Sequence, residues 1–213
     1  MSEPITLYGM TGSVYTRVAQ IVLREKELSF EYEEIDPFEL PLPAFYAALH
    51  PFGRVPVLKH GEFALYETQA ITTYLDTTFP GPSLIPSDDK ARARMIQVIS
   101  IIDAYGYWPL VRQVFEQRVW NALDNLPVDE AVIANGLEVS GKVIAALEAI
   151  SAEGLVLNSN GITRADAHLA PMIDYFRMAP EGAAMLAQHP HLSAWWHQME
   201  TRASVRDTRP SLS

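Results

Sequence analysis

Residues 50–58 of the chain, HPFGRVPVL, end in the segment 55–58, VPVL, which has the composition of a β-strand except for its proline. Proline has no backbone N–H, so the Val55-Pro56 pair interrupts the hydrogen-bond ladder that an interior strand would make. Residues 55–58 and 63–66 flank a turn that contains Gly61, which predicts a β-hairpin. The pair Glu67-Thr68 follows directly, where the next helical pattern begins.

The chain before this hairpin alternates short strand and helix patterns. Residues 5–8, ITLY, are apolar or β-preferring and end at Gly9, which predicts a first strand. Residues 15–27 carry apolar side chains at helical spacing, with charges on the opposite side, which predicts a helix. Residues 30–35, FEYEEI, alternate in the manner of a half-exposed strand. A proline-rich segment and a short helix at residues 44–49 then lead to the hairpin.

Beyond residue 80 the pattern changes from mixed to helical. Two prolines and a glycine in residues 80–83, PGPS, prevent either kind of element from continuing, which indicates a linker. The later apolar residues all recur at helical spacing, in a long helix kinked near residues 105–109 and in several shorter ones. We therefore expect a first domain at residues 1–80, a linker at 81–87 and an all-helical domain at 88–213.

Composition excludes several classes of function. The chain has no cysteine, so it has no disulfide, no thiolate metal site and no cysteine nucleophile, and any sulfur chemistry must use a thiol from outside. A net charge of -10 without a Lys/Arg cluster argues against binding nucleic acid or an anionic membrane. His189, His191 and His197 lack the spacing of zinc fingers or metalloproteases, so we expect no metal. With neither a leader pattern nor a long apolar run, we expect a cytoplasmic protein.

Residues 50–58, together with the ETQAI segment that begins at Glu67, resemble the glutathione-binding signature of the cytosolic glutathione transferase superfamily. The resemblance implies an α/β thioredoxin-like N-terminal domain that binds glutathione as co-substrate, followed by an all-α C-terminal helical bundle. In that family the proline is cis, and the main chain of Val55 beside Pro56 would pair with the cysteinyl part of glutathione as an added strand does. Thr68 and nearby helix N–H groups suit the γ-glutamyl carboxylate, while Glu67 suits its ammonium group.

A second motif lies in the C-terminal half. Residues 161–166, GITRAD, resemble the family's buried helix-start signature. Thr163 and Asp166 have the relation of a capping box, with Asp in place of the usual Glu. This motif indicates a role in folding rather than in catalysis. The resemblance therefore spans nearly the whole chain. Within the family the chain is similar to the serine-type members, but these motifs do not define its class.

The residues after the first strand concern the glutathione thiol, which must ionise to become a good nucleophile. Lowering its pKa from about 8.5 by about two requires roughly 2.7 kcal/mol of preferential stabilisation of the thiolate. Ser13 is the first choice of donor, because it precedes the first helix, whose dipole also favours an anion. In serine-type members the donor usually lies five residues before the Arg aligned with Arg17, whereas Ser13 lies four before it. Thr11, Tyr8 and Tyr15 therefore stay as alternatives, and Ser13 is otherwise an ordinary helix N-cap.

The glycyl carboxylate of glutathione has no obvious basic partner in the sequence. Relatives often place Lys, His or Gln in the loop before the Val-Pro motif, but residues 38–42 read FELPL. Arg54 is the candidate substitute, although a solvated loop arginine would have the same appearance.

The resemblance also implies an electrophile pocket between the domains, bounded by the loop after the first strand, the kinked helix and the C-terminal segment. Its candidate wall residues are Met10, Tyr105, Tyr107, Trp108 and Arg112. Aromatic residues at helical spacing also occur in ordinary cores, so this set is a hypothesis.

The sequence thus predicts an enzyme, a glutathione transferase that activates the glutathione thiol for attack on a small hydrophobic alkyl or aryl electrophile. Family analogy implies a homodimer. The alternative is a transferase-like fold retained as a non-catalytic binding or structural module. The displaced Ser13 and the missing basic loop residue favour that alternative.

Overall fold

A computed structural model describes residues 3–158 and 160–211 of the chain. These residues divide into two compact units. The first comprises the described residues up to Ser83 together with Asp207–Pro210, and the second comprises Leu84–Arg206 and Ser211.

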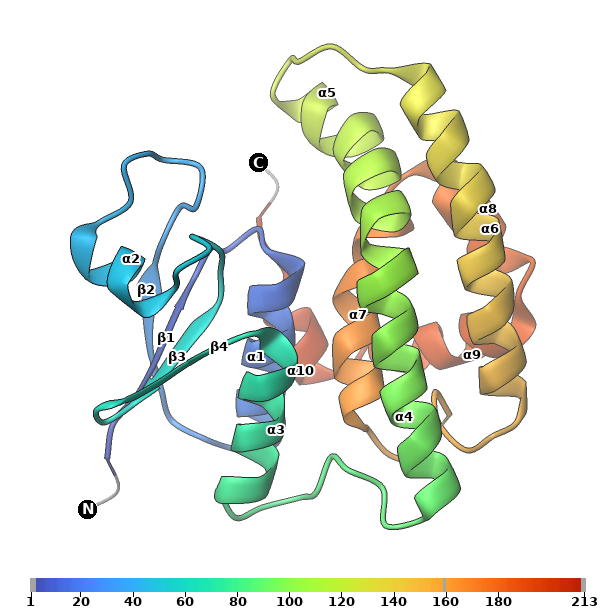
Figure 1. Cartoon of the computed structure of the whole chain (residues 1–213). Coiled ribbons are helices and arrows are strands. Elements are labelled where there is room, and N and C mark those ends of the chain that lie inside the picture. Colours follow the sequence, from blue (N-terminus) through green and yellow to red (C-terminus); the bar gives the residue numbers. More distant parts are fainter. Residues whose placement is uncertain (1–2, 159, 212–213) are drawn as a thin grey trace. The chain divides into compact units, whose positions relative to one another are not determined.

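The first unit contains a four-stranded mixed sheet with helices on both faces (Figure 1). Its strands are β1 (Ile5–Gly9), β2 (Glu31–Glu34), β3 (Val57–His60) and β4 (Phe63–Tyr66), in the order β2-β1-β3-β4. β1 and β2 are parallel, whereas the β1–β3 and β3–β4 pairs are antiparallel. The helices of this unit are α1 (Val14–Glu25), α2 (Ala44–Leu49) and α3 (Thr68–Thr78). The predicted order of strands and helices is confirmed.

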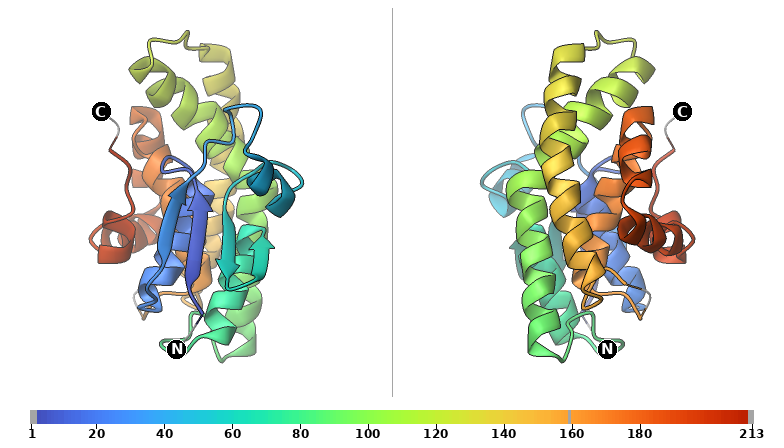
Figure 2. Two further views of the ribbon diagram at one scale, coloured as in Figure 1. Left: turned by 90° about the vertical axis from the view of Figure 1, so that its left-hand side faces the viewer. Right: turned by 90° about the vertical axis from the view of Figure 1, so that its right-hand side faces the viewer.

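Apolar residues fix which side of this sheet each helix covers. The side chains of Ile5 and Leu7 alternate into the core along β1, where the buried faces of α1 and α3 meet them. On the opposite face, Tyr46 of α2 packs against Ile35 and Val57. The left view of Figure 2 looks onto this face of the sheet, with α1 behind it. The sheet is therefore covered on both faces.

A buried ion pair joins the end of α1 to α3. Lys26 Nζ lies 3.4 Å from Asp76 Oδ1, with side-chain exposures of 1% and 2%. The same ammonium group donates to the carbonyl oxygens of Asp76 and Pro82, both at 3.2 Å. Burying an ammonium group is costly unless its donors are satisfied, and here they reach three oxygen atoms.

Among its described residues, 84–158 and 160–206, the second unit contains helices joined by turns and loops, and no strand. A long helical segment runs through α4 (Asp89–Ile101), the π-helical η1 (Ile102–Gly106) and η2 (Trp108–Trp120), and α5 (Asn121–Leu123). It is followed by α6 (Glu130–Ala152), α7 (Arg164–Phe176), α8 (Pro180–Ala187), α9 (Pro190–Met199) and α10 (Ala203–Arg206). The predicted fold class, a thioredoxin-like α/β domain and an all-α domain, is confirmed.

The long segment differs in detail from a simple kinked helix. Its start is capped by Asp88, whose Oδ1 accepts from Ala91 N at 2.8 Å. From Ile102 onward the backbone takes the wider π-helical form on both sides of Pro109. Proline lacks an N–H and clashes with the carbonyl of the preceding turn in an α-helix, so a departure from α-helical geometry at this position has a physical cause.

Asp166 secures the start of α7 in the manner that the capping-box spacing predicts. Its Oδ2 accepts from Thr163 N at 2.7 Å and from Thr163 Oγ1 at 2.6 Å. Its Oδ1 accepts from Trp195 Nε1 at 2.7 Å, a contact from α9 that the local spacing does not reveal. Burial raises the pKa of Asp166, and the hydrogen bonds from Thr163 and Trp195 oppose that rise.

We expect Asp166→Asn to destabilise the protein by roughly 2–4 kcal/mol, because one amide oxygen cannot replace two carboxylate oxygens that receive three hydrogen bonds. Urea unfolding at neutral pH measures the change. The matched control is Asp89→Asn, whose side chain is 93% exposed and should alter the midpoint little. Equal effects of the two variants would contradict the structural role of Asp166.

Candidate functional site

Strand register brings three segments that are distant in the sequence to one edge of the sheet. Tyr8 of β1 pairs with Val57 of β3, and Val57 in turn pairs with Tyr66 of β4. The chain therefore leaves the sheet at one end of these strands in three places: after β1, before β3 and after β4. We call this end of the strands the edge of the sheet. The segments at these three places are the loop of residues 10–13, the Val55-Pro56 pair and Glu67-Thr68.

The loop of residues 10–13 makes a tight connection from β1 to α1. Gly9 ends the strand, and a Cβ at this position would collide with the Thr16 side chain, so only glycine fits. Thr16 is fully buried, and its Oγ1 accepts from Met10 N at 3.3 Å. The loop is thus held close to the first turn of α1.

Ser13 is the N-cap of α1. Its Oγ accepts from Thr16 N at 3.3 Å, and its own N–H donates to Met10 O at 2.9 Å. The hydroxyl therefore serves as the ordinary cap that the sequence allowed. A serine hydroxyl that accepts one hydrogen bond still has its own proton to donate, so capping and donation to an anion are compatible.

Thr11 uses its hydroxyl differently. Thr11 Oγ1 donates to Glu34 Oε2 at 2.7 Å, and Thr11 N donates to Glu34 Oε1 at 2.9 Å. Tyr32 OH also donates to Glu34 Oε2, at 2.9 Å. Burial, above all, raises the pKa of Tyr32, which keeps its phenol a neutral donor. The proton of Thr11 is therefore directed at a carboxylate of the protein.

The two tyrosine alternatives lie in other surroundings. The ring of Tyr8 packs 5.9 Å from that of Phe45 and 6.1 Å from that of Tyr46, on the face of the sheet that α2 covers. Tyr15 is half-buried in the first turn of α1.

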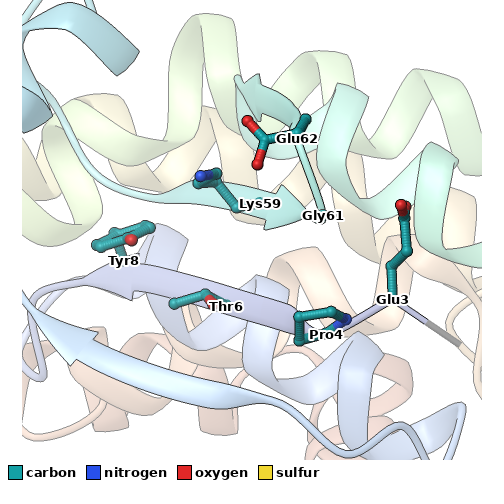
Figure 3. A pocket seen from close by; sticks show the side chains of 7 residues that line it. All are labelled: Glu3, Pro4, Thr6, Tyr8, Lys59, Gly61 and Glu62. Atoms are coloured by element: carbon teal, nitrogen blue, oxygen red, sulfur yellow. The ribbon is translucent and has the colours of Figure 1, made fainter. Parts of the chain in front are cut away.

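Tyr8 also borders a polar cavity of about 380 Å³ (Figure 3). Lys59 and Glu62, from the β3–β4 hairpin, carry charges into this cavity, and Thr6 contributes a hydroxyl from β1. Its other lining residues are Glu3, Pro4 and Gly61. None of the predicted site residues except Tyr8 borders it, so this cavity does not coincide with the edge described above.

The Val55–Pro56 peptide bond is cis, as the resemblance implied. Val55 is half-buried and packs against the cluster of Ile35, Tyr46 and Val57. Tyr46 OH donates to the carbonyl oxygen of Arg54 at 2.6 Å, which anchors the residue before this pair. The Arg54 side chain itself is exposed.

Glu67 has an unusual backbone conformation at the start of α3. Its φ of 71° is in the left-handed region, which costs a residue with a side chain about 1–3 kcal/mol. The Glu67 side chain is exposed, and Thr68 behind it is buried. Such strained residues occur mainly at binding and catalytic sites, and this one lies at the N-terminus of a helix, where N–H groups have no partner within the helix.

His50 belongs to this region, although sequence reasoning assigned it no role. It is 3% exposed, its Nδ1 accepts from Phe52 N at 3.3 Å, and its ring lies 4.7 Å from that of Tyr66. Burial lowers the pKa of His50, the nearby Glu67 opposes this effect and Arg54 adds to it. Its place directly before the Pro-Phe-Gly turn was the signal that could have identified it.

Glu34 is a second residue of this region to which the sequence patterns assigned no role. It ends β2 in register with Gly9, which places its carboxylate beside the loop after β1. Parallel strands end at the same edge of a sheet, so an acidic residue at the end of the second predicted strand was the available signal.

Most of the candidate wall residues lie in the π-helical part of the second unit. Tyr105 and Trp108 are 66% and 62% exposed, and Tyr107 is half-buried. Arg112 Nη1 forms an ion pair with Glu116 Oε2 at 2.7 Å. The fifth candidate, Met10, is half-buried in the first unit.

Two kinds of feature are absent from the described residues. Residues 3–158 and 160–211 contain no group of three or more His, Asp or Glu side chains arranged to hold a metal ion. In the same residues, no helix combines the length and apolar character needed to cross a membrane.

Comparison with known proteins identifies the family. The family model described as Glutathione S-transferase, N-terminal domain, matches residues 7–83, and the one for the C-terminal domain matches residues 108–203. The chain is 31% identical to Glutathione S-transferase 3 of Zea mays, with 96% of this chain and 93% of that protein covered. It is 28% identical to Glutathione S-transferase F13 of Arabidopsis thaliana, over 97% and 95% of the two chains.

A solved structure agrees with these sequence matches. The apo form of glutathione S-transferase III superposes with a TM-score of 0.84 at 30% identity, over 96% of this chain and 95% of that one. The chain belongs to the glutathione S-transferase family.

The environment of His50 predicts a pH effect on stability. Its pKa is below the value of about 6.5 in the unfolded chain, so between the two values the unfolded chain binds more protons. The contribution of neutral His50 to the free energy of unfolding is therefore complete above about pH 6.5. It is lost as the pH falls towards the lowered pKa of His50. We expect His50→Gln, which keeps a side-chain acceptor for Phe52 N, to weaken the pH dependence of the urea midpoint between about pH 5 and 7.

The control for this experiment is His197→Gln, since the His197 side chain is 82% exposed. It should leave the pH dependence unchanged. If wild type and His50→Gln lose stability in parallel on acidification, another group is responsible.

Proposed function

We propose that this chain transfers glutathione to a small hydrophobic alkyl or aryl electrophile, with the Ser13 hydroxyl stabilising the glutathione thiolate. The observation that carries the proposal is the position of Ser13 at the N-terminus of α1, at the sheet edge where Val55-Pro56 and Glu67-Thr68 also lie. Membership of the glutathione S-transferase family supports the transferase activity and glutathione as co-substrate. The proposal requires no metal.

The main chain of Val55, next to Pro56, is proposed to pair with the cysteinyl part of glutathione. Glu67 is proposed to bind the ammonium group, and the Thr68 hydroxyl with the first N–H groups of α3 to bind the γ-glutamyl carboxylate. Arg54 is the proposed partner of the glycyl carboxylate. Its guanidinium is exposed, and its backbone carbonyl is held by Tyr46 OH, directly before the Val55-Pro56 pair.

The chemistry proposed for Ser13 is donation of a hydrogen bond to the sulfur. Together with the dipole of α1, one such bond to an anion is sufficient in magnitude to lower the thiol pKa by about one to two. The thiol proton leaves to solvent, the thiolate sulfur forms a bond to the electrophilic carbon, and the leaving group departs with its electron pair.

The four hydroxyl candidates differ in what their protons already contact. Thr11 donates to Glu34, and Tyr8 packs under α2 beside a cavity away from the site. Tyr15 lies inside the first turn of α1, whereas Ser13 occupies the cap position before it. Ser13 is therefore the preferred donor.

We propose residues 1–80 as the glutathione-binding domain, 81–87 as the linker and 88–213 as the electrophile-binding domain. The proposed pocket wall comprises Met10, Tyr105, Tyr107, Trp108 and Arg112, because exposed aromatic side chains suit a hydrophobic electrophile. A cytoplasmic location without nucleic-acid or membrane partners is also proposed, in keeping with a net charge of -10.

We expect Ser13→Ala to lower kcat/KM for a chromogenic electrophile by roughly 10- to 100-fold, while KM for glutathione changes much less. Loss of the cap would also destabilise α1 by about 1 kcal/mol, so Ser13→Gly, which preserves most of the capping energy, separates the two effects. Ser29→Ala, an exposed serine of the same unit, is the control.

Wild-type protein should also be retained on immobilised glutathione. Absence of both retention and turnover in the wild type would overturn the proposed function. Full activity of both Ser13 variants would leave the transferase activity in place and move the donor role to another group.

We further propose a two-fold homodimer, by analogy with the family. Size-exclusion chromatography with light scattering should give twice the mass of one chain at micromolar concentration. A single-chain mass under these conditions would refute the proposal.

A further inference from the structure

Glu34 is an exposed acidic residue whose carboxylate accepts three hydrogen bonds from the protein. Oε1 accepts from Thr11 N at 2.9 Å, and Oε2 accepts from Thr11 Oγ1 at 2.7 Å and from Tyr32 OH at 2.9 Å. A surface carboxylate normally contacts water, and fixing its rotamers costs conformational entropy. Three hydrogen bonds at one exposed carboxylate therefore need a structural reason.

Strand register places this carboxylate close to the loop of residues 10–13. Glu34 is in register with Gly9, and Ile35 N donates to Gly9 O at 2.7 Å. The last ladder contact of β1 thus lies directly beneath the loop. From this position the Glu34 side chain needs only to extend past the end of the strand to reach Thr11.

The loop is held from two sides. On the helix side, Thr16 Oγ1 accepts from Met10 N, and Thr16 N donates to Ser13 Oγ. On the strand side, Glu34 accepts both the N–H and the O–H of Thr11. Thr16 and Ser13 belong to the same continuous segment as the loop, whereas Glu34 belongs to a different strand. Glu34 therefore ties the loop to the sheet.

We propose that Glu34 is a positioning residue for thiol activation: by accepting from both hydrogen-bond donors of Thr11, it fixes the loop so that the Ser13 hydroxyl faces the glutathione sulfur. This inference rests on the proposed function of Ser13. A hydrogen bond to a thiolate requires the donor to be held within a few tenths of an ångström, so an anchor outside the loop acts on the reaction without touching the substrate.

The charge of Glu34 and its contact with the loop have opposite effects on the pKa of the glutathione thiol, which makes the proposal testable. A carboxylate near the site disfavours a thiolate, so removing its charge would by itself lower the thiol pKa. Loosening the loop would instead weaken the bond from Ser13 and raise the thiol pKa. Thr11→Val removes the hydroxyl contact without changing the charge, and Glu34→Gln changes both.

The experiment measures the pKa of the glutathione thiol in the complex, from the ultraviolet absorbance of the thiolate and from the pH profile of kcat/KM. Positioning predicts that Thr11→Val raises this pKa by about one and lowers kcat/KM at neutral pH about tenfold. Glu34→Gln should raise the pKa as well, by a smaller amount, because loss of the carboxylate charge acts in the opposite direction. KM for glutathione should change less than about threefold, because neither residue is proposed to contact it. Thr11→Ser, which restores the hydroxyl, should behave as wild type.

Glu33→Gln is the matched control. It removes the same charge from the adjacent residue of β2, whose side chain points to the opposite face of the sheet. It should leave both the thiol pKa and kcat/KM unchanged. Thermal unfolding of all variants checks that each is folded at the assay temperature.

Two outcomes overturn the proposal. A thiol pKa that falls in Glu34→Gln and stays unchanged in Thr11→Val means that Glu34 acts through its charge. Wild-type behaviour of both variants means that the loop needs no anchor from β2. In either case an active wild type that is disabled by Ser13→Gly leaves the proposed function intact, whereas a wild type without thiolate or turnover rejects the proposed function itself.

Discussion

The hydrogen-bond ladder through β1 is the constraint on which the candidate site depends. β1 pairs with β2 on one side and with β3 on the other, and this register brings Gly9 beside Glu34 and Tyr8 beside Val57. A one-residue slip would turn every side chain of β1 to the opposite face and separate the loop after it from its partners. Leu7 opposes such a slip, because its fully buried side chain would have to leave the core and face the opposite side of the sheet.

Two helix N-termini meet at this edge of the sheet within the first unit. α1 begins after Ser13 and α3 begins after Glu67, so both have N–H groups and positive dipole ends at the proposed glutathione site. In the proposed binding mode, this arrangement would let a chain of net charge -10 bind an anionic tripeptide without a cluster of basic residues. The strained backbone of Glu67 is the cost of that arrangement.

Much of this organisation could be predicted from local signals. The strand and helix order follows from apolar periodicity, and the start of α7 follows from the spacing of Thr163 and Asp166. Contacts between distant residues could not be predicted in this way, as Lys26 with Asp76 and Trp195 with Asp166 illustrate. Nothing in their sequence separation favours one partner over another, because packing of whole elements selects them.

The sequence by itself determined the class of fold, the family and the set of hydroxyl groups among which the thiol donor is sought. Apolar periodicity, proline and glycine positions act over a few residues, so they are readable along the chain. Only the tertiary structure decided how those hydroxyls are used: Thr11 is directed to Glu34, Tyr8 packs under α2 and Ser13 caps α1. The physical reason is that a hydroxyl's partners are set by strand register and helix packing, which arise only when the whole domain folds.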